Sequence, residues 1–507
     1  MQTPRTVASY FGAFAPAPEW EELAWWPPDV FALANLVLDH TESYRFAIAP
    51  PRGRRWPPLP DWNAEVHAAG RAWRDAAGRP RGELPALVRR FWDGATARRE
   101  TPLDAVQSGD AWELVEALLT LHALADEACA DVATSGRWAA AGSFEALAWR
   151  RLQRGGSLSR LSPTRVRIVP KTHLTAHGIT IISLSRYLAL SYESVDIRWR
   201  SVEPDPPRKR RDLAIVLVPW PLFVRARDFR PAAQAPIENM DLDRFGFFEF
   251  APEAPLDHEL LHGLLAEALE EEGRIDAVVF PEDAVDPAET AALQRTLDEY
   301  GANFLVAGVR QPPEEGHFGR NYLHFGVRTP SGWESYEQDK HHRWCLDEGQ
   351  IHQYHLSRSL DAGKLWWEAI DVRERALHVF DLGLGVTATP LVCEDLARLD
   401  EVAELVRRIG PSLVVAVLLD GPQLSSRWPC RYASVLADEP GSTVLTLTSY
   451  GMAARSRPPG KPSSRVIAHW NNRRDGLHEI ELAPGASGVL LLASVDSRTL
   501  WTADGRR

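Results

Sequence analysis

The sequence contains few cysteines, few lysines and no long apolar run, and each shortage narrows the class of protein. Four cysteines lie far apart in 507 residues. The first residues show no apolar signal-peptide core, so the scattered cysteines predict reduced thiols in a cytosolic protein. No run of about 18 apolar residues occurs, so we expect no transmembrane helix.

Lysine is scarce among the basic residues. Of 57 lysines and arginines, 5 are lysines. The lysine ammonium is compact, and its pKa shifts readily when the side chain is buried. A position that stays lysine in such an arginine-rich chain can depend on these properties of the ammonium. This makes Lys340 a candidate functional residue.

Net charge and composition exclude further classes. The net charge of -12 at pH 7 argues against a nucleic-acid or anionic-membrane surface over the whole molecule. With 45% hydrophobic and 25% charged residues, the composition is that of a globular protein. Because 507 residues exceed the usual span of one domain, two domains are expected.

Three ranges follow from the pattern along the chain. Residues 1–201 are expected to be mostly helical, with a few strands at their end near 165–169 and 179–182. Residues 202–211 are predicted to form a Pro/Arg-rich linker, which prolines stiffen and basic residues keep solvated. In residues 212–500 strand and helix patterns alternate, which predicts an α/β domain with helix-covered sheets.

The helices are expected where apolar residues recur at helical spacing, and the strands where apolar or β-branched residues form short runs. The predicted helices lie at about 62–78, 83–97, 110–133, 142–153, 257–272, 287–300 and 399–408. The predicted strands lie at about 213–218, 277–280, 304–309, 323–327, 376–380, 387–393, 413–419, 443–448 and 488–493.

Three short motifs carry reactive side chains. The segment Val-Val-Phe-Pro-Glu ends at Glu282, and a carboxyl beside such a buried strand can have its pKa raised into the range of a base. Asp-Lys-His-His contains Lys340, and Leu-Val-Cys-Glu-Asp places Cys393 at the turn after an apolar strand. Each motif has an ordinary alternative: a solvated acid, a surface lysine and a buried core cysteine.

Together the three side chains supply what hydrolysis of a carbon–nitrogen bond needs. Glu282 would take the thiol proton of Cys393, and Lys340 would lower the thiol pKa and stabilise the oxyanion. Glu348 is a candidate to hydrogen-bond to Lys340 or to substrate, or else an exposed loop acid. Supporting roles at the pocket are also expected for His342 and Glu394.

Phe-Pro-Glu, Lys-His-His and Val-Cys-Glu-Asp, in that order, resemble motifs of the nitrilase superfamily of carbon–nitrogen hydrolases. The resemblance covers the α/β domain and implies an αββα sandwich. It implies Glu282 as general base, Lys340 as oxyanion stabiliser, Cys393 as nucleophile and Glu348 as the family's second glutamate. It further implies that the chemistry needs no metal or organic cofactor and that the protein forms a homo-oligomer. The helical region before this domain is not explained by it.

Two turns near the expected pocket rim depart from the family pattern. Leu-Asp-Gly-Pro stands at residues 419–422, where an Asn-Pro type of turn is common. Thr-Ser-Tyr-Gly stands at residues 448–451, where an Asn-x-x-Gly turn is common. The resemblance therefore does not extend to the substrate.

Two other patterns in the sequence have weaker support. His342, Cys345, His352 and His355 resemble a zinc set, but the segment between the two pairs is too short for a usual zinc-finger loop. The basic run at 208–211 could contact nucleic acid, yet such a run in a proline-rich linker is usually solvated.

The sequence thus predicts a cytosolic thiol hydrolase that cleaves an amide, nitrile or carbamoyl carbon–nitrogen bond through a thioester intermediate. The alternative is an interaction or regulatory module of a multi-component system, bacterial defence systems included, in which residues 1–201 bind a partner protein. The state of Cys393 distinguishes the two hypotheses. If the protein is an enzyme, we expect a depressed thiol pKa; if it is a binding module, we expect an inert, buried thiol.

Overall fold

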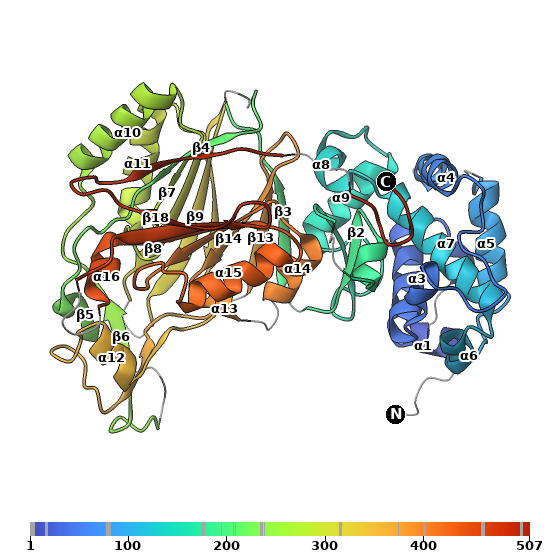
Figure 1. Ribbon diagram of the computed structural model, residues 1–507, viewed down its shortest axis with the longest axis horizontal. Helices are drawn as coiled ribbons and strands as arrows, with labels where there is room; N and C mark the ends of the chain where they lie inside the picture. Colours follow the sequence, from blue (N-terminus) through green and yellow to red (C-terminus); the bar gives the residue numbers. More distant parts are fainter. Residues whose placement is uncertain are drawn as a thin grey trace.

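The computed structural model describes most of the chain (Figure 1). The described residues are 6–15, 19–77, 83–174, 178–193, 195–205, 207, 209–233, 237, 239–313, 317–373, 375–398, 402–457, 462–496 and 500–507. Pro206 and Arg208 of the predicted linker, and with them part of the basic run, lie outside this set, as do residues 399–401 of a predicted helix. Among the described residues, no helix is both long and apolar enough to cross a membrane.

A helical region opens the chain, as predicted (Figure 1). Its two central helices, α3 (Pro27–His40) and α7 (Trp112–Ala128), pack against each other and are buried along nearly their whole length. Such helices are apolar on all sides because their neighbours surround them. The other helices are α1 (Val7–Gly12), α2 (Trp20–Leu23), α4 (Trp62–Ala77), α5 (Ala86–Thr96), α6 (Leu103–Ser108), α8 (Val132–Ser135) and α9 (Phe144–Gly155), with the 3-10 turns η1 (Ser43–Ala47) and η2 (Gly136–Trp138).

A two-stranded sheet follows the helices. Strand β1 (Arg167–Pro170) pairs antiparallel with β2 (Leu188–Ser191). The strand predicted at 179–182 is wrong, because a 3-10 turn, η3 (Ile181–Leu184), stands there. The hydroxyl of Thr180 accepts a hydrogen bond from the Ser183 N–H at 3.3 Å, and this local cap overrides the β-branched composition of the segment.

Two large sheets form most of the remaining structure. One has six strands in the order β10-β9-β8-β7-β4-β19, and the other has seven in the order β18-β17-β16-β15-β14-β13-β3. The first comprises β4 (Leu213–Leu217), β7 (Ala277–Val279), β8 (Phe304–Gln311), β9 (Arg320–Thr329), β10 (Gly332–Asp339) and β19 (Val489–Ala493). The second comprises β3 (Asp196–Ser201), β13 (Ala376–Asp381), β14 (Thr387–Val392), β15 (Leu413–Leu418), β16 (Thr443–Thr448), β17 (Val466–Asn472) and β18 (Gly476–Glu481).

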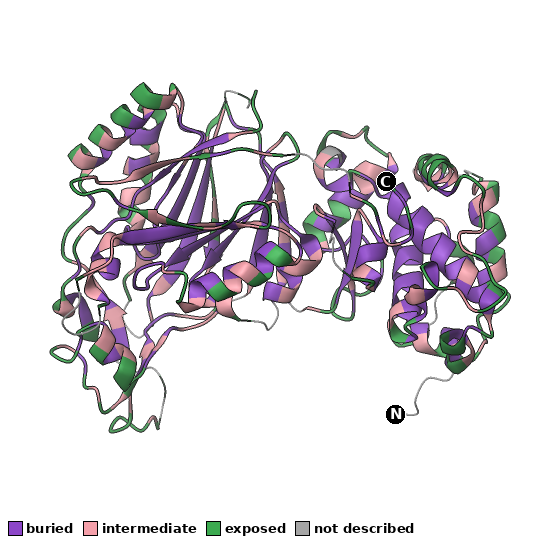
Figure 2. Cartoon of the chain, viewed as in Figure 1, coloured by how far each residue is buried: buried purple, intermediate pink, exposed green. Residues whose placement is uncertain are grey.

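The two sheets pack face to face and carry helices on their outer faces (Figures 1 and 2). Alternation along β4 shows the layers: Leu217 faces the core between the sheets, and Val216 packs under the outer helices. Those helices are α10 (His258–Glu272) and α11 (Pro287–Glu299) on the first sheet, with α13 (Glu394–Ala397), α14 (Glu404–Ile409), α15 (Trp428–Asp438) and α16 (Tyr450–Arg455) on the second. The predicted αββα sandwich behind a helical region is confirmed.

A smaller four-stranded sheet stands beside the sandwich, in the order β11-β12-β6-β5. Its aromatic core includes Phe248, Trp344 and Tyr354. The elements are β5 (Phe229–Pro231), β6 (Phe245–Phe250), β11 (Cys345–Leu346) and β12 (Leu365–Glu368), with α12 (Glu348–Gln353) and the 3-10 turn η4 (Ala226–Asp228). This sheet fixes the end of β12, which carries Glu368.

The helical region and the sandwich are joined at several places, including one strand and the last residues of the sequence. Strand β3 belongs to the seven-stranded sheet and pairs parallel with β13, although residues 196–201 fall in the range predicted as N-terminal. The end of the chain returns to the helices, where Arg506 pairs with Asp126 of α7 at 3.1 Å (Figure 1).

Candidate active site

Glu282 lies in a tight turn after β7 and is fully buried. This turn approaches β8 very closely. A Cβ atom on Gly308 would lie 2.3 Å from Cα of Glu282 and 2.4 Å from the carbonyl oxygen of Pro281. Only a glycine fits at position 308, because any side chain would push the carboxylate out of place.

Three hydrogen bonds hold the Glu282 carboxylate. Its Oε1 accepts hydrogen bonds from Nζ of Lys340 and from Nδ2 of Asn321, each at 2.7 Å. Its Oε2 accepts one from the backbone N–H of Leu419 at 2.5 Å. The contacts come from both large sheets and fix the carboxylate in one orientation.

Lys340 follows β10 and lies between two carboxylates. Its Nζ donates to Oε1 of Glu282 at 2.7 Å and to Oε2 of Glu368 at 2.6 Å, and its side chain is 1% exposed. Burial lowers the pKa of Lys340, but the two carboxylates outweigh burial and hold the pKa well above its usual value. The side chain is therefore a permanent cation at neutral pH.

Glu368, at the end of β12, is a candidate site residue that was not selected from the sequence. Its Oε2 accepts from Lys340 and from the Trp344 N–H at 3.1 Å, and its Oε1 accepts from Asn321 at 2.7 Å. A carboxylate that ends an aromatic strand gives the same signal as Glu282, and this signal could have found it.

Glu348 does not reach this cluster. It begins α12, its side chain is 77% exposed, and its nearest ionic neighbour is His352 at 3.8 Å. The structure therefore corrects the assignment of the second glutamate: Glu368, and not Glu348, contacts Lys340. The helix carries Glu348 outward because Asp347 caps its first turn and Ile351 packs inward.

Cys393 connects β14 to α13 through a strained backbone. Its φ of 42° and ψ of -104° are unfavourable for a residue with a side chain. A strained strand-to-helix turn of this kind presents a nucleophile at the end of a sheet. Cys393 is 2% exposed, and it lines a cavity of about 210 Å³. The cavity wall also includes Trp344, Glu394, Asp420 and Tyr432.

The protonation of Cys393 differs from the expectation of a depressed pKa. Burial raises the pKa of its thiol well above the usual value, Glu282 raises it further, and Lys340 lowers it. The protonated thiol is thus the resting form. Such a thiol needs a base at the moment it attacks.

Glu282 has the properties of that base. Burial raises the pKa of its carboxyl, Lys340 lowers it, and Glu368 raises it again. Asp283, beside it, has a φ of 53° and a pKa raised well above the usual value by burial and by the two glutamates. Several carboxyls around one ammonium share protons, which suits a group that must both accept and return a proton.

Two of the supporting residues predicted from sequence lie at this site. His342 forms a hydrogen bond through Nδ1 with Oδ1 of Asp395 at 2.9 Å, and Asp395 also accepts from the His341 N–H at 3.1 Å. These bonds fasten the loop after Lys340 to the helix that follows Cys393. Glu394 lines the cavity, and burial raises the pKa of its carboxyl.

Asp420 is a further polar group on the cavity wall. Its Oδ1 accepts hydrogen bonds from Nη2 of Arg427 at 2.6 Å and from the hydroxyl of Tyr354. Its Oδ2 is buried and accepts no hydrogen bond from any residue that the structure describes. Asp420 lies in one of the two turns that depart from the family pattern.

Among the described residues, one group has the spacing for a metal ion: Glu282, Asp283 and Glu368 offer oxygen atoms within 4.8 Å of one another. The Lys340 ammonium already supplies a positive charge to two of them. The histidines and cysteine of the proposed zinc set are not part of this group. His352, for example, lies near Ser357 on the exposed surface.

No protein-family profile and no curated protein sequence matches the chain. Similar solved structures include Nit3 of Saccharomyces cerevisiae, a member of branch 10 of the nitrilase superfamily, with a TM-score of 0.35 and 13% identity over 56% of this chain and 90% of that one. XC1258 of Xanthomonas campestris, a CN-hydrolase superfamily protein with an arsenic adduct in its active site, has a TM-score of 0.34 and 16% identity over 56% and 91%.

A mutant of the amidase from Nesterenkonia sp. AN1, with an acetamide moiety added covalently at its active-site cysteine, has a TM-score of 0.33 and 15% identity over 57% of this chain and 92% of that one. These structures belong to the superfamily that the three motifs resemble. Because these identities and TM-scores are low, both the fold and the chemistry of this chain are argued from its own geometry.

Proposed function

We propose that the protein is a thiol hydrolase that cleaves a non-peptide carbon–nitrogen bond. The observation that carries the proposal is the position of one buried ammonium, Lys340, between two carboxylates beside a cavity that a strained cysteine lines. Within the described residues, two of the three ammonium N–H bonds are directed to Glu282 and Glu368. In the proposal, the third stabilises the oxyanion that forms when Cys393 attacks.

The reaction would proceed in two halves. As the Cys393 sulfur bonds to the substrate carbon, its proton passes to Glu282, and Lys340 stabilises the negative oxygen. The carbon–nitrogen bond then breaks, and the departing nitrogen takes the proton from Glu282. In the second half a water molecule gives a proton to Glu282 while its oxygen attacks the thioester. The sulfur leaves and recovers the proton.

Asp420 favours amide and carbamoyl substrates over nitriles. Its buried Oδ2 accepts no hydrogen bond from the described residues, and it lines the same cavity as Cys393. An amide or carbamoyl group carries N–H donors that would pair with this oxygen, whereas a nitrile has none. A site that must leave a buried acceptor unpaired disfavours that ligand.

The experiment is ammonia release from a panel of primary amides, carbamoyl compounds and nitriles, with the native chain and Cys393→Ala. We expect release with amide or carbamoyl members and none from the variant. Cys129→Ala is the matched control, because Cys129 is a buried cysteine of α7's C-terminal end, far along the chain from the cavity. It should keep full activity.

The regulatory-module alternative predicts a different result. The buried thiol and its raised pKa are features that an inert cysteine shares. No release across the panel, together with no alkylation of Cys393 by iodoacetamide up to alkaline pH, would contradict the hydrolase. Alkylation that depends on Glu282 would support it.

A further inference from the structure

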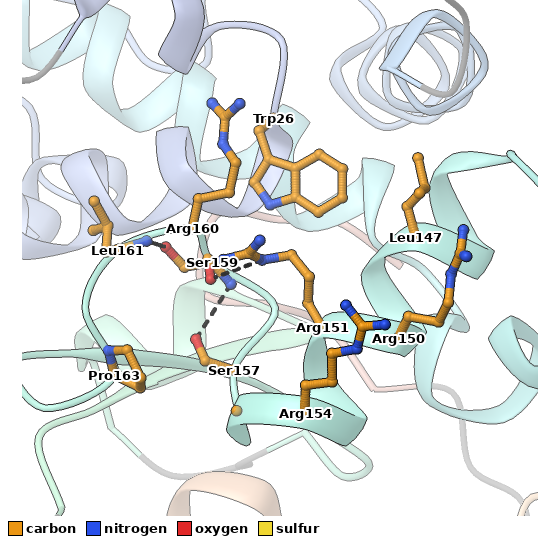
Figure 3. Close-up of a pocket in the computed structure, with 11 residues that line it drawn as sticks. Trp26, Leu147, Arg150, Arg151, Arg154, Ser157, Ser159, Arg160, Leu161 and Pro163 are labelled. Atoms are coloured by element: carbon orange, nitrogen blue, oxygen red, sulfur yellow. Dashed lines mark hydrogen bonds between the residues drawn. The ribbon is translucent and has the colours of Figure 1, made fainter.

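A second cavity, far larger than that of Cys393, lies in the helical region. Its volume is about 540 Å³, within the range of small-molecule sites. Four arginines line it: Arg150, Arg151 and Arg154 from α9, and Arg160 from the loop that follows. Figure 3 shows these side chains around one space, with Arg151 extended toward Trp26.

Arg160 is already paired. Its Nε donates to Oδ2 of Asp29 at 2.7 Å, and its backbone N–H donates to Oδ1 of the same carboxylate at 2.7 Å. Asp29 is buried in the first turn of α3 and also accepts from the Ser159 hydroxyl at 2.7 Å. The Asp29 carboxylate therefore already has partners on both oxygens, and it holds Arg160 and the loop in place.

The three arginines of α9 have no such partner. Within the described residues, no carboxylate lies within ion-pair distance of Arg150, Arg151 or Arg154. Arg150 and Arg154 stand one turn apart on the helix, a spacing at which like charges destabilise it. All three arginines are exposed, so an anion in the cavity can reach their guanidinium groups from solvent.

Arg151 brings a further positive charge to the cavity wall. Its Nε donates to the carbonyl oxygen of Ser159 at 3.3 Å, which draws the guanidinium over the cavity floor (Figure 3). Burial lowers the pKa of Arg151 and the charge of Arg160 lowers it further, whereas Asp29 opposes them. A bound anion would relieve this repulsion.

Apolar side chains form the rest of the wall. Trp26, Leu147, Leu161 and Pro163 line the cavity between the arginines. The indole N–H of Trp26 is bonded to the carbonyl oxygen of Leu158 at 2.8 Å, so the ring contributes apolar surface to the cavity. A ligand that fills this space needs a multiply charged anionic end and a flat apolar end.

We propose that this arginine-lined cavity binds a nucleoside di- or triphosphate, with the phosphates on Arg150, Arg151 and Arg154 and the base against the apolar wall. Guanidinium groups bind phosphate oxygens in pairs of charge-assisted hydrogen bonds. The cavity is separate from that of Cys393 in its lining residues, so the proposal stands apart from the hydrolase.

The test is isothermal titration of the full chain with ATP, ADP and pyrophosphate at fixed salt. We expect saturable binding of ATP, and weaker binding of pyrophosphate because it lacks the base. Arg154→Glu should weaken ATP binding by about tenfold or more, since it replaces an attractive charge by a repulsive one. Its thermal unfolding temperature, measured without nucleotide, should match that of the native chain because Arg154 is exposed.

Arg89→Glu is the matched control: Arg89 is an exposed arginine of α5 in the same helical region and does not line the cavity. It should bind ATP as the native chain does. Equal losses in the two variants would mean that only net charge matters and would overturn the proposal. Absence of ATP binding by the native chain, or equal affinity for ATP and pyrophosphate, would overturn it as well.

Discussion

Two buried ion clusters, one in each part of the molecule, allow the proposed active site to be compared with a structural ion cluster. In the sandwich, Lys340 lies between Glu282 and Glu368. In the helical region, Arg506 pairs with Asp126 at 3.1 Å and with Asp504 at 2.9 Å. Both clusters are fully buried, and both hold a cation among carboxylates.

The clusters differ in what lies next to them. Asp126 also accepts the backbone N–H groups of Arg186, Tyr187 and Leu188, and Arg506 donates to the carbonyl oxygen of Leu184 at 2.6 Å. That cluster joins chain segments. The Lys340 cluster instead adjoins a cavity and a cysteine. Burial and pairing are common to both clusters, so the proposal of an active site depends on the adjacent cavity and cysteine.

Glu282→Gln should have the largest effect of the variants, because it removes the proposed base from the Lys340 cluster. Glutamine keeps the shape and can still accept from Lys340, but it is not a base. We expect kcat on a responsive amide to fall about 10²- to 10⁴-fold with little change in KM. Glu348→Gln is the control, because that carboxylate is exposed and should be dispensable. Equal losses in both variants would contradict the assignment.

Arg506→Met should break the structural cluster. It leaves Asp126 and Asp504 buried without their cation, so the free energy of unfolding should fall by about 3–5 kcal/mol. Urea denaturation measures this loss, and the kcat of the folded protein should stay unchanged. Arg507→Met, at an exposed position that contacts Trp501, should change stability by less than about 0.5 kcal/mol. A stable Arg506→Met variant would show that the cluster contributes little.

Asp420→Asn tests whether this carboxylate on the cavity wall selects amides over nitriles. The variant loses the carboxylate that Arg427 holds and offers N–H groups toward the ligand. We expect kcat/KM for amides to fall about 10- to 100-fold, and for nitriles to change much less. Asp438→Asn, an exposed position in α15, is the control. A uniform loss on all substrates would leave Asp420 with no part in selection.

Lys171→Met tests the structural cluster through pH. Burial lowers the pKa of Lys171 to about 7, the nearby Arg506 lowers it too, and Asp126 opposes them. Between pH 7 and the unfolded value of about 10.4, the unfolded chain binds the extra proton, so native stability rises with pH by up to about 1.4 kcal/mol per unit. The variant should lack this slope in urea denaturation between pH 7.5 and 9.5. If the free energy of unfolding changed with pH in the same way in both proteins, Lys171 would not be the source of the slope.

Amphipathic helices and short apolar strands could be predicted from the sequence because their patterns are local. The predicted helices near 62–78 and 142–153 are confirmed as α4 and α9, and the predicted strand at 304–309 is confirmed within β8. Helix α3 was not predicted because it is buried on all sides and has no amphipathic period. Strand β3 was not predicted either, and its partner, β13, lies far along the chain.

Some residues of the candidate site could also be chosen from the sequence, and others could not. Glu282 was chosen from the end of an apolar segment and Lys340 from a charged one, and the structure brings them into contact. Glu368 ends an aromatic strand, which is a signal in the sequence, but only the folded chain shows that β12 lies beside Lys340. The sequence position of Glu348 suggested a partner, but the helix turns it to solvent. The roles proposed for these residues remain for the experiments above.

The position of β3 also matters for solubility. Every residue of β13 is buried, and its backbone on one side pairs with β3 over the full length from residue 376 to 381. Outside β3, α9 closes the edge, and Gln153 donates to the Trp199 carbonyl oxygen at 2.8 Å. A sandwich cut free at the predicted linker would expose an apolar strand with unpaired hydrogen-bonding groups. Because such an edge can recruit strands from other chains, we expect the sandwich without residues 1–201 to aggregate more readily than the full chain.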